Sequence, residues 1–274
     1  KNGLISNNIV SGIEDAAIYV GMSDNVHVNN NEVYASVAGI EFENSRHGVI
    51  ENNLVYDNAG GILTFITPGL PIKTTYDLII RNNFITNNNH VNFGAPGSMV
   101  SGVPSGTGIV IMAADEVTME NNIISGNKNA AIIITDHDSF PNITKDPETD
   151  PKSDKIAILN NVMYNNGYEP IDEIKALKVA TLTSDDVYMV NIGNSRESCI
   201  LNRDQYVSIG LKDFGTCGFT TTADVVTRLL PERVAPREIT ELDKGKMTYF
   251  GVCTGCHAYG MRMIGPPVET IQAL

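Results

Sequence analysis

A six-residue pattern of apolar and polar positions recurs along the first 165 residues of the chain. Each copy has an apolar residue, a variable residue, two asparagines, a variable residue and a second apolar residue, as in ISNNIV from Ile5 and IENNLV from Ile50. The first asparagines of the six copies are Asn7, Asn30, Asn52, Asn82, Asn121 and Asn160, so successive copies are 23, 22, 30, 39 and 39 residues apart. This recurrence indicates a protein built from repeats.

Short apolar runs share this period and indicate strands. They follow a small residue at Ala17, Gly39, Gly61, Gly108 and Ala131, and three of the four intervals are 22, 22 and 23 residues. Runs of four or five alternating, often β-branched residues between polar corners are typical of strands and too short for helices. The longer spacings contain insertions of about 8 or 17 residues rich in Gly, Pro and Asp, where we expect loops.

A unit of about 22 residues cannot bury its apolar face alone, so we expect the units to stack into a solenoid. The paired asparagines suit such a stack, because Asn tolerates the left-handed backbone of a tight corner. Their side chains can also form a hydrogen-bonded ladder from coil to coil. The pattern resembles the right-handed parallel β-helix proteins over roughly residues 1–165, which implies a mainly β fold. We assign residues 1–218 to this β-helix, with an irregular last coil and a closing segment.

The chain is acidic, with 19 Lys and Arg against 32 Asp and Glu, a net charge of −13 and a pI near 4.7. Nucleic acid is excluded as a partner, because binding phosphates requires a basic face. An acidic polysaccharide would need a local basic cluster or bridging cations. No apolar run approaches the roughly 18 residues that span a bilayer, so we expect no transmembrane segment. The chain begins inside a repeat and ends without a terminator, so we expect both ends to be cut and any export signal to be lost.

The β-helix resemblance also implies an enzymatic alternative, because the fold includes polysaccharide lyases, hydrolases and epimerases. The stretch TDHDSF places Asp136, His137 and Asp138 after an apolar run and partly resembles the Asp-Pro-His-Asp motif of mannuronan C5-epimerases. Thr135 and Asp136 replace the first Asp and the Pro of that motif. A His beside carboxylates could remove the proton next to a uronate carboxylate, and Arg81 could neutralise the resulting enolate. The alternative is a solvated polar corner.

Calcium is a second alternative for the same region. Four acids lie in KDPETDPKSDK, but Pro and Lys separate them and the pattern of a calcium loop is absent. They are Asp146, Glu148, Asp150 and Asp154.

The four cysteines fall into two pairs. Cys199 and Cys217 have 17 residues between them, and we expect a disulfide, with two separate buried thiols as the alternative. Cys253 and Cys256 lie in FGVCTGCHAYG, three positions apart, with His257 directly after them. Zinc needs four ligands and no second pair follows at finger spacing. A thioredoxin-like site would need a βαβ context, which is lacking.

Covalent haem remains, because two thiols can bond the two vinyl groups of a porphyrin while the adjacent His ligates the iron. The segment ELDKGKMTYFGVCTGCHAYGMRMIGPPVETI resembles class I c-type cytochromes. These carry, on the helix before the motif, a glycine eight residues ahead of the first Cys and an aromatic residue four positions after that glycine. Gly245 and Tyr249 fit both positions, and Asp243 could cap that helix. A Gly-Pro follows the motif, as at Pro266.

The resemblance implies haem c, with thioether bonds at Cys253 and Cys256 and His257 as the proximal iron ligand. The backbone near Pro266 would accept a hydrogen bond from the other ring nitrogen of that histidine. Such cytochromes supply a distal Met tens of residues later. Two methionines, Met261 and Met263, follow His257 too closely for this role, so we expect the sixth ligand beyond Leu274.

Residues 219–241 then form a linker with a short helix and prolines, and residues 242–274 form the N-terminal part of a cytochrome domain. The sequence predicts an exported bacterial protein, periplasmic or at the cell surface. In this hypothesis the β-helix is a docking or glycan-binding scaffold, and the haem exchanges electrons with a redox partner protein. One alternative is a polysaccharide lyase or uronate epimerase with an accessory haem domain. Another is a structural assembly module.

Overall fold

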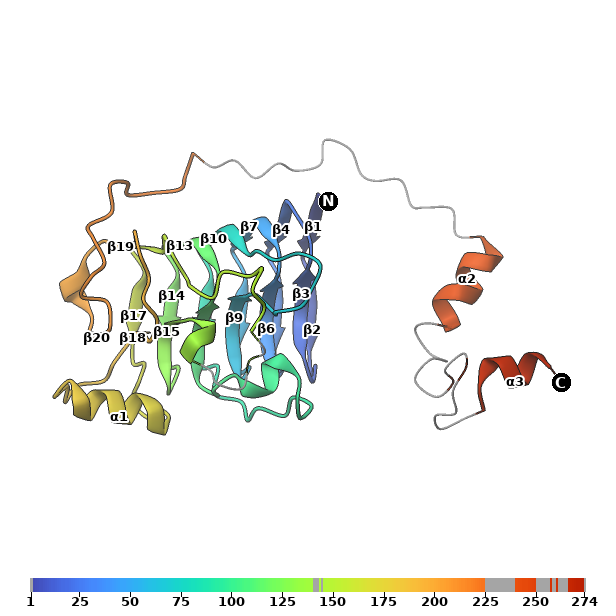
Figure 1. The fold of residues 1–274 in the computed structure, drawn as a ribbon. Helices are drawn as coiled ribbons and strands as arrows, with labels where there is room; N and C mark the ends of the chain where they lie inside the picture. The colour runs from blue at the N-terminus through green and yellow to red at the C-terminus, as the bar shows by residue number, and fades with distance from the viewer. Residues whose placement is uncertain are drawn as a thin grey trace. The chain divides into compact units, whose positions relative to one another are not determined.

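In the computed structural model, strands of consecutive coils stack into three parallel sheets (Figure 1). The structure describes residues 2–139, 143, 145–224, 240–249, 257, 260 and 266–273. The chain divides into two compact units, residues 1–229 and residues 230–274. The described strands all belong to the first unit, so the expectation of a mainly β solenoid is confirmed there.

The first six coils each contribute one strand to each of the three sheets, which we call A, B and C, and the last coil contributes only to A and C. Sheet A is ordered β1 (Gly3–Ser6), β4 (Val26–Asn29), β7 (Arg46–Glu51), β10 (Tyr76–Arg81), β13 (Asp115–Glu120), β16 (Ala157–Leu159) and β19 (Cys199–Ile200). Sheet B contains β2 (Ile9–Ser11), β5 (Glu32–Tyr34), β8 (Leu54–Tyr56), β11 (Phe84–Thr86), β14 (Ile123–Ser125) and β17 (Val162–Tyr164). Sheet C contains β3 (Ala16–Gly21), β6 (Ala38–Glu43), β9 (Gly60–Phe65), β12 (Thr107–Met112), β15 (Ala130–Thr135), β18 (Met189–Asn191) and β20 (Ser208–Ile209).

The core lies inside the coils, where equivalent apolar residues stack along the axis. In sheet A the parallel register aligns Val28, Ile50, Ile80, Met119 and Ile158, each at most 2% exposed. Burial of such a row is the main stabilising contribution, at about 25 cal/mol per Å² of apolar surface. Because each coil offers its apolar face to two neighbours, no coil is stable alone.

The paired asparagines take the two roles that the sequence predicted, one residue to each role. The first Asn of every pair has a left-handed backbone, with φ between +49° and +60°. The second Asn lies in a ladder in which each Nδ2 donates to the Oδ1 of the next coil over 2.9–3.0 Å. The ladder runs through Asn8, Asn31, Asn53, Asn83, Asn122 and Asn161.

A second asparagine ladder, which the sequence pattern did not reveal, follows sheet B. Nδ2 of Asn58, Asn88 and Asn127 donates to Oδ1 of the next coil over 3.0–3.2 Å, ending at Asn166. The residues before these four are again left-handed, but they are Asp57, Asn87, Gly126 and Asn165. The dipeptides therefore differ, and a search for Asn-Asn does not connect them.

The insertions fall between strands and leave the ladders in register. The loops after β9, β11 and β15 carry the extra residues, and two of them contain the short 3-10 helices η1 (Met99–Gly102) and η2 (His137–Ser139). A third 3-10 helix, η3 (Arg203–Gln205), lies between β19 and β20.

The irregular last coil is confirmed and includes a helix. Helix α1 (Asp172–Ala180) packs through its buried Ile174 against Ala130 and Ile133 of β15. Cys199 and Cys217 form the expected disulfide, which ties residues 215–217 to β19. None of the described helices is long and apolar enough to cross a membrane.

The start of the expected linker is part of the solenoid instead. Thr220 accepts a hydrogen bond at its carbonyl oxygen from Asn160 (3.3 Å), and Thr221 and Thr222 are bound to Glu120. We call residues 215–222 the closing strap. Most of the remaining linker, residues 225–239, lies outside the described residues.

Candidate functional site

The second unit contains two described helices that flank the cysteine motif. Helix α2 (Glu241–Thr248) begins at Thr240, whose Oγ1 accepts a hydrogen bond from the backbone of Asp243 over 3.1 Å. The Asp243 carboxylate in turn accepts from the backbone of Thr240 over 3.3 Å. Asp243 therefore takes part in a capping box at its third position and is not itself the N-cap, which corrects the expectation from the sequence.

His257 contacts residues on both sides of the cysteine motif, Tyr249 before it and Pro266 after it. Its Nδ1 lies 2.8 Å from the carbonyl oxygen of Pro266, the acceptor region expected from the sequence, shortly before helix α3 (Val268–Gln272). The hydroxyl of Tyr249 donates to the carbonyl oxygen of His257 over 3.3 Å. With Nδ1 directed at a carbonyl, Nε2 is the nitrogen that can bind a metal. Cys253 and Cys256 lie outside the described residues.

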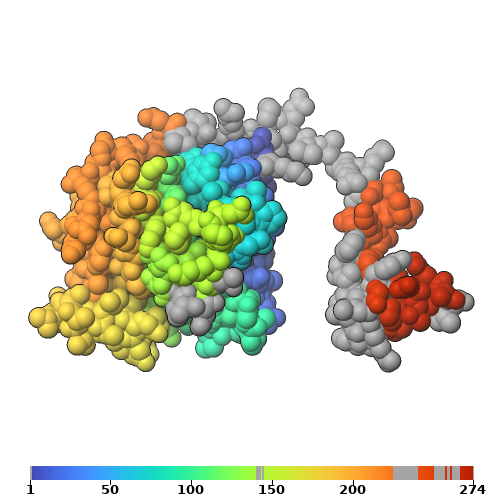
Figure 2. All heavy atoms as spheres, viewed as in Figure 1, coloured from blue at the N-terminus to red at the C-terminus, as the bar shows by residue number. Residues whose placement is uncertain are grey.

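The stretch around His137 is a packed loop. His137 is 4% exposed, and its Nε2 lies 2.8 Å from the carbonyl oxygen of Ile66. Burial lowers the pKa of this imidazole, against the effect of that hydrogen bond. A neutral ring must carry its proton on Nε2 to donate to a carbonyl, so this nitrogen is not free to act as a base. In Figure 2 the yellow-green atoms of the loop cover part of one face of the solenoid.

The two aspartates of this loop form ion pairs with lysine. Lys152 Nζ lies 2.9 Å from both Asp136 and Asp138. Hydrogen bonds from Lys152 and Lys145 lower the pKa of Asp138 to about 2. Burial raises the pKa of Asp136, but hydrogen bonds from Ser139 and Lys152 outweigh it and hold the pKa below its usual value. These contacts are those of a structural corner.

Two of the acids considered for calcium are paired with basic side chains instead. Asp146 accepts hydrogen bonds from Lys73 (2.6 Å) and from the backbone of Gly69 (2.9 Å), while Asp154 is paired with Arg196 at 2.7 Å. Within the described ranges, no group of three or more Asp, Glu, His or Cys side chains is arranged to hold a metal ion.

Arg81 is not brought to His137. It ends β10 at the corner between sheets A and B, whereas His137 follows β15 at the corner between sheets C and A. A six-residue strand separates these corners, about 20 Å of chain. Arg81 instead donates to Glu51 over 2.6 Å and to the carbonyl oxygen of Thr222 over 2.7 Å.

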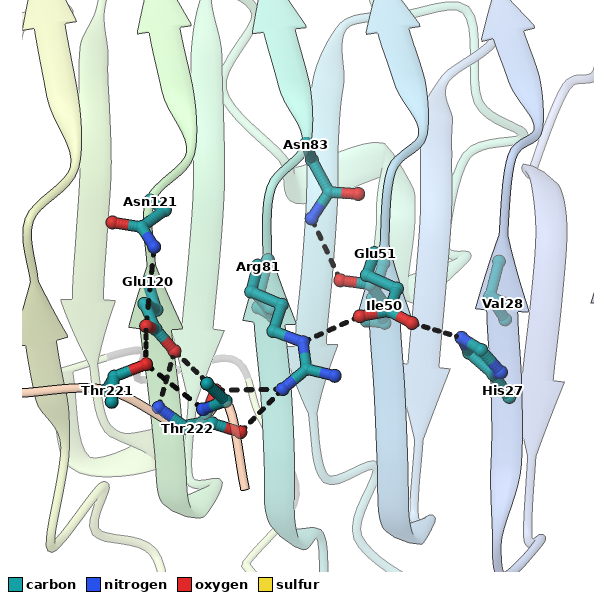
Figure 3. Close-up of polar contacts among 12 residues, drawn as sticks. His27, Val28, Ile50, Glu51, Arg81, Asn83, Glu120, Asn121, Thr221 and Thr222 are labelled. Atoms are coloured by element: carbon teal, nitrogen blue, oxygen red, sulfur yellow. Dashed lines mark hydrogen bonds and ion pairs between the residues drawn. The ribbon is translucent and has the colours of Figure 1, made fainter. Parts of the chain in front are cut away.

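Arg81 belongs to a charged row on the outer face of sheet A (Figure 3). Register places Glu51, Arg81 and Glu120 side by side on successive coils. His27 Nε2 lies 2.9 Å from Glu51 Oε1, and burial lowers the pKa of His27 although Glu51 opposes this. The row could have been found from the sequence, because its members on β7, β10 and β13 all occupy the first variable position of the repeat.

Glu120 anchors the closing strap. Its two carboxylate oxygens accept from the hydroxyl of Thr221 (2.6 Å), the backbone N–H of Thr222 (2.8 Å) and the hydroxyl of Thr222. Burial raises the pKa of Glu120, but these hydrogen bonds and the charge of Arg81 outweigh that effect. The pKa is therefore below its usual value, and the carboxylate stays ionised. The charged row therefore holds Thr221 and Thr222 at the end of the closing strap against sheet A.

Comparison with known proteins agrees with the architecture of the first unit. A family model described as a right handed beta helix region matches residues 1–147, which is more than half of the chain. No curated protein and no solved structure shows significant similarity to the chain.

Proposed function

Because the chain belongs to the right-handed β-helix family, we propose that it is an exported scaffold protein whose solenoid carries an electron-transfer segment with covalently bound haem c. The observation that carries the proposal concerns His257, the last residue of the CTGCH sequence. Its Nδ1 contacts the carbonyl oxygen of Pro266, nine residues later in the chain. This contact fits a haem ligand, since a ligating histidine is normally oriented by a hydrogen bond at its other ring nitrogen.

The chain's own residues would each have a defined task. Cys253 and Cys256 would bond the porphyrin, and His257 Nε2 would ligate the iron. The carbonyl of Pro266 orients the imidazole, while the hydroxyl of Tyr249 donates a hydrogen bond to the backbone carbonyl of His257. The bound group would supply a one-electron couple for exchange with a redox partner protein.

Export is supported by the disulfide between Cys199 and Cys217, because disulfides persist mainly in oxidising compartments. A periplasmic or cell-surface location is consistent with it. The lyase or epimerase alternative has no comparable support, since His137 is buried and both neighbouring aspartates are paired with lysine.

The test is a pyridine haemochrome spectrum of the chain, produced with cytochrome c maturation machinery. We expect a c-type spectrum that survives denaturation, and its loss in the double variant Cys253→Ser/Cys256→Ser. His47→Ala is a control, because this partly exposed histidine lies outside the cysteine motif and contacts Asp77 and the ring of Tyr76. A wild-type chain without covalent haem under these conditions contradicts the proposal.

A second measurement addresses the ligand geometry. In Pro266→Ala the carbonyl oxygen is kept, so we expect haem content to change little. In His257→Ala the thioether bonds can still form, but the spectrum of the native protein should lose its low-spin features. An unchanged native spectrum in His257→Ala would show that another residue ligates the iron.

A further inference from the structure

The outer face of sheet B carries two regular rows of side chains with different chemistry. Its strands have three residues, the middle one pointing into the core and the outer two pointing out. The first outer row is aligned by the parallel register and consists of Ile9, Glu32, Leu54, Phe84, Ile123 and Val162. Four of its apolar members are 37–71% exposed, so the row is an apolar line open to solvent.

The second outer row has a residue with a hydroxyl group on each of the six strands, although Ser125 is only 4% exposed and its hydroxyl is bonded to that of Thr86 over 3.0 Å. Its members are Ser11, Tyr34, Tyr56, Thr86, Ser125 and Tyr164. Tyr164 is 52% exposed, and the rings of Tyr34 and Tyr56 stack with centroids 5.2 Å apart. We call the two rows together the sheet B strip. The left-handed corner asparagines described above border its apolar side with exposed amides.

Charge is nearly absent from this strip, in a chain whose net charge is −13. Glu32 is its one ionisable acid, and that carboxylate accepts a hydrogen bond from the hydroxyl of Tyr56 over 2.8 Å. Neither row contains Lys or Arg, so the strip offers nothing to neutralise an anionic ligand. Its chemistry selects an uncharged ligand that has both apolar and hydroxyl surface.

The dimensions favour a narrow, linear ligand over a protein. Six strands about 4.8 Å apart span roughly 24 Å, and three residues at about 3.3 Å give a width of about 10 Å. The resulting area of about 240 Å² is well below the roughly 800 Å² per partner of a stable protein interface. A second copy of the chain would therefore need contacts beyond the strip.

We propose that the sheet B strip binds a single chain of an uncharged polysaccharide laid along the solenoid axis. The apolar C–H faces of the sugars would lie on the row of Leu54 and Phe84, and their hydroxyls would meet the hydroxyl row and the corner amides. Repetition from coil to coil matches a polymer, since five of the six coils place an apolar side chain beside a residue that bears a hydroxyl group. The inference rests on the scaffold half of the proposed function and names the class of ligand that the scaffold binds.

Affinity gel electrophoresis of the full chain tests this directly. Native gels would contain hydroxyethyl cellulose, xyloglucan or mannan as neutral polymers, and alginate or polygalacturonate as anionic ones. We expect retardation in at least one neutral gel and none in the anionic gels. The double variant Leu54→Ser/Phe84→Ser should weaken retardation about tenfold or more, because apolar contact area is lost.

The double variant Val179→Ser/Leu182→Ser is the matched control. These side chains are 76% and 93% exposed at the end of α1, outside the strip, and their replacement should leave retardation unchanged. Circular dichroism and melting of all variants check the fold. Equal retardation of the wild type and the strip variant, retardation confined to anionic gels, or no retardation in any gel each overturns the proposal.

Light scattering on the same samples distinguishes self-association. A dimer that the Leu54→Ser/Phe84→Ser variant abolishes would assign the strip to a second copy of the chain and overturn polysaccharide binding. Haem content measured in parallel keeps this inference separate from the proposed electron transfer. Retardation without haem contradicts only the proposed electron transfer. Haem without retardation contradicts only polysaccharide binding.

Discussion

The two asparagines of each repeat are chemically identical but have different structural roles. The first lies at the exposed corner and needs only a backbone that tolerates φ near +55°. The second is buried in every copy after the first, and in the four inner copies it links three coils. Asn83 shows the second role fully. Its Oδ1 accepts from both the backbone N–H and Nδ2 of Asn53, and its Nδ2 donates to Asn122 and to the carbonyl oxygen of Ile50.

We expect Asn83→Ala to destabilise the protein by about 2–4 kcal/mol, because two buried donors of Asn53 and the carbonyl of Ile50 lose a partner. Asn82→Gly is the matched control. Glycine adopts the same φ of +56° without strain, so the change in the free energy of unfolding should stay within about 0.5 kcal/mol. Urea unfolding followed by circular dichroism measures both. Equal effects of the two substitutions would contradict the division of roles.

Glu41 is a buried acid that the repeat pattern did not single out. It lies on β6, is 3% exposed, and none of the described residues hydrogen-bonds its Oε2. Burial, together with the charges of Asp15 and Glu43, raises its pKa to about 8. A carboxyl whose pKa is higher in the folded than in the unfolded state stabilises the fold at low pH, and this contribution is lost as pH rises toward the folded pKa.

Replacing Glu41 with Gln should therefore remove one pH-dependent contribution. Between the ordinary value of 4.5 and about pH 8, the wild type should lose stability relative to Glu41→Gln by up to about 1.4 kcal/mol per pH unit. Glu14→Gln, which removes an exposed carboxylate, serves as the control for the change in charge. Urea midpoints from pH 4 to 9 give the result, and a constant difference between wild type and Glu41→Gln would show that Glu41 is ionised when folded.

Among the elements, strands were predictable from the sequence and the contacts of the loops were not. Each strand repeats a local pattern, so six copies reinforce one another, and the register follows from stacking like on like. The loop after β15 has one copy only. Its half motif suggested chemistry, but burial of His137 and the position of Lys152 depend on residues far away in sequence, such as Ile66. A closing segment was predicted up to residue 218, but the contacts of residues 220–222 with Asn160 and Glu120 were not, for the same reason.

The closing strap is fastened at both ends, by the disulfide and by Glu120. Removing the disulfide with Cys199→Ser/Cys217→Ser should lower the free energy of unfolding by about 3 kcal/mol, as expected for a closed loop of this length. Glu120→Gln should lower the free energy of unfolding by less than this, but it should loosen the contact between the closing strap and sheet A. Hydrogen exchange at the backbone N–H of Thr222 reports this, and unchanged protection in Glu120→Gln would show that the carboxylate does not hold the strap.

The molecule as a whole joins a solenoid to a small second unit. The interactions described for the strands, both ladders and the disulfide all fall within residues 1–224. A chain ending at Asp224 should therefore keep the circular dichroism of the solenoid. Its melting temperature should lie within about 2 °C of that of the full chain, since a loss of 1 kcal/mol shifts a domain of this size by only about 2–4 °C. A larger drop would show that the solenoid depends on the second unit.

The two asparagine ladders also share a direction. In both, each amide-to-amide bond runs from one coil to the coil that follows in sequence, while the same Nδ2 of the inner members also donates to a carbonyl oxygen of the preceding coil. A ribosome releases the chain in that same order, so each coil emerges with its donors already oriented and waits only for the acceptors of the next. The solenoid is thereby suited to growth from one end during synthesis, with the most recent coil serving as the template for its successor.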